Sequence, residues 1–185
     1  MIVIVIPAKG ASNRLPNKNM TAINGRPMID YAIDQALASK RAEAVYVSTD
    51  SDDIAAHAEA RGVAVIRRPE SLGGEVPIID VYRHALAHMP DGDTVAVLVG
   101  LQPDHPDRDI GVDESLEIFE REGADRLMST QADGTKNGAH YVLSRHFVES
   151  GESRGDVTII DDCTNIHFPA DLERARQRLA EREAS

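Results

Sequence analysis

The sequence has 185 residues, with 20 Lys and Arg against 31 Asp and Glu and a formal net charge of −11. This length suits a single domain over 1–185 with a sizeable core, and 42% hydrophobic and 28% charged residues are ordinary for a soluble globular protein. So acidic a balance argues against a nucleic-acid or anionic-membrane surface, which needs clustered Lys and Arg. The single Cys163 excludes an internal disulfide, and the apolar runs are too short for a signal segment or a membrane span. We therefore expect a cytoplasmic protein.

Short apolar strands alternate with helices along the chain. Residues 2–6 form a β-branched apolar strand, and a loop rich in Pro, Gly and Asn follows over 7–19. In chain order we then expect a helix beginning at Pro27, a strand over 44–48, a helix capped by Ser51 and ended by Gly62, a strand over 63–66, a helix over 78–89, a strand over 94–99, a helix over 109–122, strands over 126–130, 139–143 and 157–160, and a helix over 169–183. Apolar strands separated by helices predict a three-layer α/β/α fold with a mostly parallel sheet, which binds ligands outside the carboxyl ends of its strands.

Positive charge is concentrated near the N-terminus. Residues 1–29 contain Lys9, Arg14, Lys18 and Arg26 and no acidic residue, so this segment carries +4 and the remainder −15. Three of these cations lie in the loop after the first strand, where the small residues 10–13 let backbone N–H groups approach an anion. At about 4 Å and an effective dielectric constant near 20, each cation–phosphate pair offers roughly 4 kcal/mol before desolvation. The loop fits neither the Walker pattern nor G-x-G-x-x-G, but it predicts a phosphate site rather than a merely solvated loop.

Seven blocks of the chain carry a resemblance to a known family. They are PAKGASNRLPNKN (7–19), NGRPMIDYAIDQALAS (24–39), VSTDS (47–51), RRPESL (67–72), LQPDHPDR (101–108), NGAHYV (137–142) and FPADLERA (168–175). In this order they resemble the cytidylyltransferases that make CMP-activated acidic sugars, of the acylneuraminate and Kdo types. The resemblance implies a Rossmann-like nucleotide-diphospho-sugar transferase fold and a Mg²⁺-dependent transfer of CMP from CTP to a small acidic acceptor, with release of pyrophosphate.

The resemblance also implies roles for individual residues. The phosphates are implied to contact Lys9, Arg14 and Lys18. The rest of the nucleotide is implied to bind Ala8, Gly10, Asn19 and Arg68, with Arg68 near the base. The acceptor is implied to face Gln102 and Arg108, and the metal positions are Asp104 and His167. Asp50 is interpreted as part of a helix cap rather than as a site residue.

One departure from the family concerns the metal. Asp104 stands where Kdo-type enzymes have a metal-binding Asp, but His167 replaces the second one. Histidine is a poor ligand for Mg²⁺, so His167 is a doubtful metal ligand, and the alternative is that it contacts acceptor or phosphate. Asp161 and Asp162 are alternative carboxylates, although such a pair at a strand end is more often solvated.

A second departure concerns length. Only residues 109–136 separate Arg108 from the Asn137 block, where enzymes for nine-carbon sugars carry a much longer segment. We expect a small anionic acceptor paired with Arg108 and Lys136, either an α-keto sugar acid or a phosphonate such as phosphonoformate or a hydroxyphosphonate. The reduced segment also leaves the oligomeric state open, a homodimer included.

Two other functions remain open on the sequence alone. The first alternative is a degenerate relative that binds a nucleotide without turning it over, which the replacement by His167 favours. The second is an enzyme of the same fold that uses GTP in place of CTP.

Overall fold

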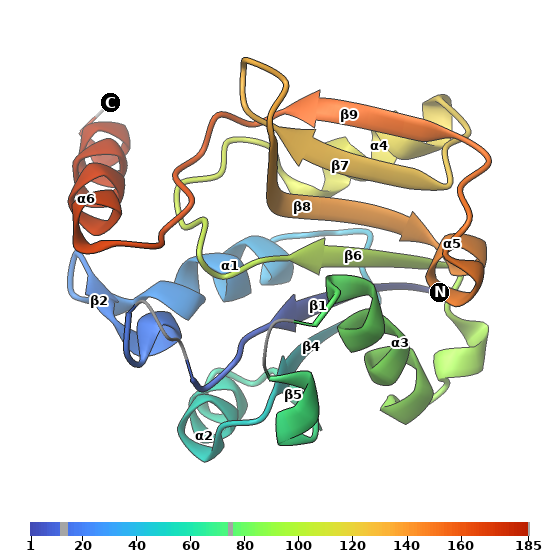
Figure 1. Cartoon of the computed structure of the whole chain (residues 1–185), viewed down its shortest axis with the longest axis horizontal. Coiled ribbons are helices and arrows are strands. Elements are labelled where there is room, and N and C mark those ends of the chain that lie inside the picture. Colours follow the sequence, from blue (N-terminus) through green and yellow to red (C-terminus); the bar gives the residue numbers. More distant parts are fainter. Residues whose placement is uncertain (12–14, 74–75, 185) are drawn as a thin grey trace.

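A seven-stranded sheet with strand order β5-β4-β1-β6-β8-β7-β9 forms the centre of the protein (Figure 1). The computed structural model describes residues 1–11, 15–73 and 76–184. The strands of this sheet are β1 (Ile2–Pro7), β4 (Ala44–Thr49), β5 (Ala64–Arg67), β6 (Val97–Leu101), β7 (Arg126–Thr130), β8 (Lys136–Ser144) and β9 (Asp156–Ile160). Only β8 runs against its neighbours, pairing antiparallel with both β6 and β7. The expected mostly parallel sheet is confirmed.

Helices cover both faces of this sheet (Figure 1). They are α1 (Met28–Leu37), α2 (Asp52–Ala60), α3 (Ile78–His88), α4 (Val112–Arg121), α5 (Arg145–Ser150) and α6 (Pro169–Glu183), with short 3₁₀ turns η1 (Lys18–Met20), η2 (Glu70–Leu72) and η3 (Gly92–Thr94). The buried residues of α1, α2 and α4 share one apolar cluster, and those of α3 and α5 share another. The expected α/β/α layering is confirmed.

Strand β1 shows why its sequence is apolar without alternation. Ile4 and Ile6 pack into the cluster under α1, α2 and α4, whereas Val3 and Val5 pack into the cluster under α3 and α5. Because successive side chains of a strand point to opposite faces, a strand covered on both sides needs apolar residues at every position. The loop that follows β1 therefore begins at the middle of the sheet, between β4 and β6.

A small hairpin that we did not expect follows the first loop. Strands β2 (Ala22–Ile23) and β3 (Arg26–Pro27) pair antiparallel around Asn24 and Gly25, whose φ angles are 49° and 80°. Two successive residues with positive φ are typical of the type I′ turn that Asn-Gly favours, so the sequence carried this signal. The hairpin shares an apolar cluster with α6, whose members include Ile23, Met28 and Leu172.

Several element boundaries differ from expectation. Helix α1 begins at Met28 because Pro27 belongs to β3, and η3 occupies the start of the strand expected from residue 94. Helix α4 begins at Val112, after Gly111, whose backbone is extended; the N–H groups of residues 109 and 110 ahead of it donate to the Asp161 carboxylate. The short helix α5 was not expected. None of the helices in the described part of the chain has the length and apolar character to cross a membrane; that 1–185 is one folding unit stays a prediction.

Candidate active site

The loop after β1 meets the ends of β4 and β6 at one edge of the sheet. Parallel pairing places the carboxyl ends of β1, β4 and β6 side by side, which is the edge where such sheets bind ligands. The Ala8 N–H donates to the Ser48 carbonyl at 2.9 Å, which joins the loop to β4, and the Asn19 side-chain amide donates to the Lys9 carbonyl at 2.8 Å, which brings the two ends of the loop together. Arg14, one of the predicted phosphate ligands, lies outside the described residues.

Lys18 and Asp104 form a largely buried ion pair at this edge. The Lys18 Nζ lies 2.6 Å from Oδ2 of Asp104, and Lys18 is only 8% exposed. The same ammonium donates to the Ile166 carbonyl at 3.1 Å, and the Ile166 N–H donates to the Asp104 carbonyl at 3.0 Å. Three segments far apart in sequence therefore converge here: the first loop, the loop after β6 and the segment before α6.

His105 contacts the other oxygen of the same carboxylate. Its Nδ1 lies 3.0 Å from Oδ1 of Asp104, and the ring is buried. Burial raises the pKa of the Asp104 carboxyl, but the His105 hydrogen bond and the charges of His105 and Lys18 outweigh it, so the pKa of Asp104 falls well below its usual range. The group stays an ionised carboxylate at neutral pH, which is the form that a cation requires.

Asp50 contacts the first loop and Arg68 instead of capping a helix, which corrects its interpretation as part of the cap. The cap of α2 is Ser51, whose Oγ accepts from the Ile54 N–H at 3.4 Å. The Asp50 carboxylate instead accepts from the Gly10 N–H at 2.9 Å and lies 3.9 Å from Nη2 of Arg68. It links the first loop to the segment after β5.

Two glycines permit the close approach around Asp50. A Cβ on Gly10 would lie 2.8 Å from the Ser51 Cβ, and a Cβ on Gly73 would lie 2.3 Å from Oδ2 of Asp50. Arg68 is buried beside them, and burial lowers the pKa of its guanidinium while Asp50 raises it. A buried cation is therefore held at the predicted nucleotide site by one carboxylate.

The two predicted acceptor residues are placed side by side. Arg108 is buried, donates from Nε to the Ala139 carbonyl at 3.0 Å, and donates from Nη2 to the Gln102 carbonyl. Burial lowers the pKa of this guanidinium. These contacts fasten the loop after β6 to β8; the acceptor-binding role of Gln102 and Arg108 stays a prediction.

The second predicted metal position carries a different set of contacts. The His167 N–H donates to Oδ2 of Asp171 at 3.0 Å, and its ring lies edge-on to the exposed Phe168 ring, with centroids 6.5 Å apart. The alternative Asp161 accepts backbone N–H groups on both carboxylate oxygens, and burial raises its pKa. No group of three or more His, Cys, Asp or Glu gathers as a metal site among the described residues. Of the predicted metal positions, Asp104 is therefore the one with a carboxylate, and it lies beside Lys18.

Unpartnered buried polar atoms surround the same edge. Most buried polar atoms in proteins have a hydrogen-bond partner. Within the described residues, those that lack one include Asn19 Oδ1, Ser48 Oγ, Arg68 Nε, Tyr82 OH, His105 Nε2 and Asn165 Oδ1. The Tyr82 hydroxyl lies against Gly100 of β6, where a Cβ would be only 2.0 Å away. Tyr82, His105 and Asn165 were not predicted as site residues, because no local pattern in the sequence distinguishes them.

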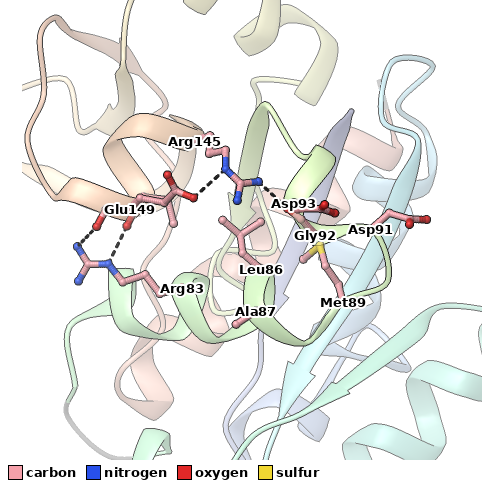
Figure 2. A pocket seen from close by; sticks show the side chains of 10 residues that line it. Arg83, Leu86, Ala87, Met89, Asp91, Gly92, Asp93, Arg145 and Glu149 are labelled. Atoms are coloured by element: carbon pink, nitrogen blue, oxygen red, sulfur yellow. Dashed lines mark hydrogen bonds and ion pairs between the residues drawn. The ribbon is translucent and has the colours of Figure 1, made fainter.

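A hollow of about 580 Å³ lies elsewhere, at the opposite edge of the sheet between α3, η3 and α5 (Figure 2). Its cations are already engaged: Arg145 donates from Nη1 to the Gly92 carbonyl at 2.7 Å and pairs with Glu149, and Arg83 donates from Nε to the Val148 carbonyl at 2.7 Å. The unpartnered groups at the carboxyl edge are the stronger indication of a ligand.

Fold and topology together define a doubly wound α/β protein, a class that binds its ligands at the carboxyl edge of the sheet. A family model described as Cytidylyltransferase matches residues 3–87. An 8-amino-3,8-dideoxy-manno-octulosonate cytidylyltransferase of Shewanella frigidimarina is 34% identical over 70% of this chain and 51% of its own length. An N-acylneuraminate cytidylyltransferase of Escherichia coli is 37% identical over 58% of this chain and 25% of its own length. Residues 3–87 thus match the cytidylyltransferase family model, and both relatives carry the name of that family.

The fold comparison covers nearly the whole chain. A CMP:2-keto-3-deoxy-manno-octonic acid synthetase, solved in complex with CTP, matches with a TM-score of 0.78 and 18% identity over 98% of this chain and 99% of that one. This match confirms the expected nucleotidyltransferase fold. The chain spans about half the length, or less, of the curated relatives named above.

Proposed function

We propose that this chain transfers CMP from CTP to a small acidic acceptor and releases pyrophosphate. The observation that carries the proposal is the Lys18–Asp104 pair, 2.6 Å apart at the carboxyl edge of the sheet. In the reaction, an acceptor oxygen forms a bond to the α-phosphorus, the bond from that phosphorus to the bridging oxygen breaks, and pyrophosphate leaves with the electron pair. Such a displacement depends on positioning and charge stabilisation, for which a cation and a carboxylate in contact supply the two required partners.

The proposal assigns the nucleotide to the residues of the first loop and to Arg68. Lys18, with Lys9 and Arg14 from the same loop, would neutralise the phosphates, and the Gly10 backbone would lie against the nucleotide. Ala8 and Asn19 hold the loop in place through their hydrogen bonds to β4 and to Lys9. The unpartnered Nε of Arg68 is available to the base.

The donor set fits Mg²⁺ with one protein carboxylate. Mg²⁺ is usually held by one or two carboxylates together with substrate phosphates and water, and Asp104 is an ionised carboxylate beside the proposed phosphate site. Bound there, Mg²⁺ would supply charge neutralisation for the phosphates and the leaving group. His167 is a poor ligand for this ion, so we assign it to the acceptor side together with Phe168.

The acceptor is proposed from the relatives and from the short segment 109–136. The names of the relatives point to sugar acids, which we take as the first class to test, and small phosphonates are the second. In this segment the structure has only α4, β7 and a turn, which supports a compact acceptor site. Lys136 is exposed, whereas Arg108 is held by two carbonyls, so Lys136 is the better placed of the two to pair with the acid group.

The test is a pyrophosphate-release screen. Purified protein with Mg²⁺ is incubated with CTP, GTP, ATP or UTP and with sugar acids, small phosphonates or no acceptor. We expect release with CTP that depends on both Mg²⁺ and an acceptor of one class. CTP binding without any product would instead support the degenerate nucleotide-binding relative, and release with GTP alone would transfer the assignment to a guanylyltransferase.

A further inference from the structure

His105 contacts Oδ1 of Asp104, the carboxylate oxygen that Lys18 does not contact. We propose that His105 is the positioning residue that orients Asp104, so that Oδ2 faces the phosphate-bound cation when Lys18 turns to the nucleotide. This inference rests on the proposed function and assigns a role within the same site. It depends on one contact, from Nδ1 of His105 to Oδ1 of Asp104 at 3.0 Å.

The contact defines which ring nitrogen carries the proton. An ionised carboxylate only accepts hydrogen bonds, so the nitrogen that bonds Asp104 must be the donor, Nδ1–H. The other nitrogen, Nε2, is buried and has no partner within the described residues. The ring therefore makes a single directed hydrogen bond, and that bond is to the proposed cation ligand.

The two oxygens of Asp104 are thereby distinguished. Oδ2 contacts Lys18 at 2.6 Å, and Oδ1 contacts His105 at 3.0 Å. When Lys18 moves to a phosphate, Oδ2 is released while Oδ1 stays bonded, so the carboxylate presents one oxygen in a fixed direction. Removal of a group that orients a metal ligand in this way commonly lowers metal affinity by about 10–100-fold.

The surroundings prevent the ring from moving. His105 is only 2% exposed. The loop that carries it is held by Asp107, a fully buried carboxylate that accepts from the N–H and the hydroxyl of Thr164, both at 2.8 Å, and pairs with Arg178 of α6 at 2.8 Å. The ring therefore has one orientation, which is what a positioning residue needs.

The experiment compares three replacements that differ in where they place a donor. In His105→Asn the amide nitrogen takes the position of Nδ1, in His105→Gln it takes the position of Nε2, and in His105→Leu it is absent. Mn²⁺ binding to the CTP complex is measured by electron paramagnetic resonance of free Mn²⁺, alongside CTP affinity without metal and the melting temperature. We expect Mn²⁺ affinity to fall about tenfold or more in the Gln and Leu variants and to stay within about threefold in the Asn variant, with CTP affinity unchanged in all three.

A second buried histidine provides the matched control. His140 is fully buried and bonds Ser115 rather than a carboxylate, so His140→Leu should lower the melting temperature without changing Mn²⁺ affinity. Equal Mn²⁺ affinity in wild type and all three His105 variants overturns the inference, and so does an Asn variant as weak as the Leu variant. If the Leu variant does not fold, the Asn and Gln variants decide the question. A wild-type protein that binds no CTP overturns the proposed function itself, which separates the two failures.

Discussion

Replacing Lys18 by methionine tests whether its ammonium group contributes more to turnover than to the free energy of unfolding. Methionine keeps most of the stem but removes the contacts to Asp104 at 2.6 Å and to the Ile166 carbonyl at 3.1 Å. Breaking a buried pair by removing one partner costs about 3–5 kcal/mol. The low end applies here, because the Asp104 side chain is 15% exposed and keeps its bond to His105.

A loss of about 3 kcal/mol leaves most domains folded, since their free energy of unfolding is about 5–15 kcal/mol. Even a variant with only about 2 kcal/mol left is roughly 97% folded, so unfolding alone would remove less than a tenth of the activity. In the proposed reaction, loss of one preorganised charge donor should slow turnover about 10²–10³-fold. The two effects therefore differ enough to be measured separately.

The assay is kcat from pyrophosphate release with CTP, together with urea unfolding of the same preparations. Lys40→Met is the matched control, because Lys40 is exposed and lies between α1 and β4, away from the carboxyl edge. We expect the control to retain both activity and stability. A folded Lys18→Met protein with the turnover of the control would refute the role of Lys18.

Two further predictions concern a close contact and a pH effect. In Gly73→Ala, the new Cβ would lie 2.3 Å from the Asp50 carboxylate; the crowding should cost about 1–3 kcal/mol and weaken CTP binding in titration calorimetry, whereas Gly111→Ala, where a Cβ meets nothing within 4 Å, should bind CTP as wild type does. Burial and, to a smaller extent, the Arg108 charge lower the pKa of His140 to about 3, so acid protonates this ring in the unfolded chain first and stability falls below the unfolded pKa of about 6.5. Between pH 7 and 5 this loss is about 2 kcal/mol, measured as urea unfolding at both pH values; a His140→Gln protein with the same pH dependence as wild type would contradict it.

The sequence predicted the sheet more fully than the site, for a physical reason. The burial of β1 and α1 can be predicted from neighbouring residues alone, because it shows as an unbroken apolar run in β1 and as helical spacing of apolar residues in α1. The hairpin at Asn24 and Gly25 was also predictable, because that dipeptide favours positive φ, but no strand or turn was predicted between the loop over 7–19 and the helix from Pro27. Boundaries were predicted less well: α4 begins after Gly111, and the backbone ahead of it binds the distant Asp161, a contact that no local pattern reports.

The site residues divide in the same way. Lys18 and Asp104 were both predicted, but their direct pairing joins positions 86 residues apart, and no local pattern reports it. Asp50 was assigned to a cap because Ser51, next to it, has the same local preference. Tyr82 looks like any aromatic residue on the buried face of a helix, and only its unpartnered hydroxyl connects it with the site.

The distribution of unpartnered atoms bears on what the edge must bind. Among the described residues, Gln35 Oε1, His84 Nδ1 and His140 Nδ1 also lack a partner, whereas Asp125 accepts from Arg154 and Ser144, and Asn137 donates to the Asp161 carbonyl. Each buried group left without a partner costs about 1–3 kcal/mol, so the six unpartnered atoms at the carboxyl edge would together cost about as much as a whole domain's stability of about 5–15 kcal/mol. Such an edge is stable only if water or a ligand supplies the missing partners. A nucleotide offers acceptor atoms of its base for Arg68 and ribose hydroxyls for Asn19, whereas an apolar ligand would leave both side chains unsatisfied.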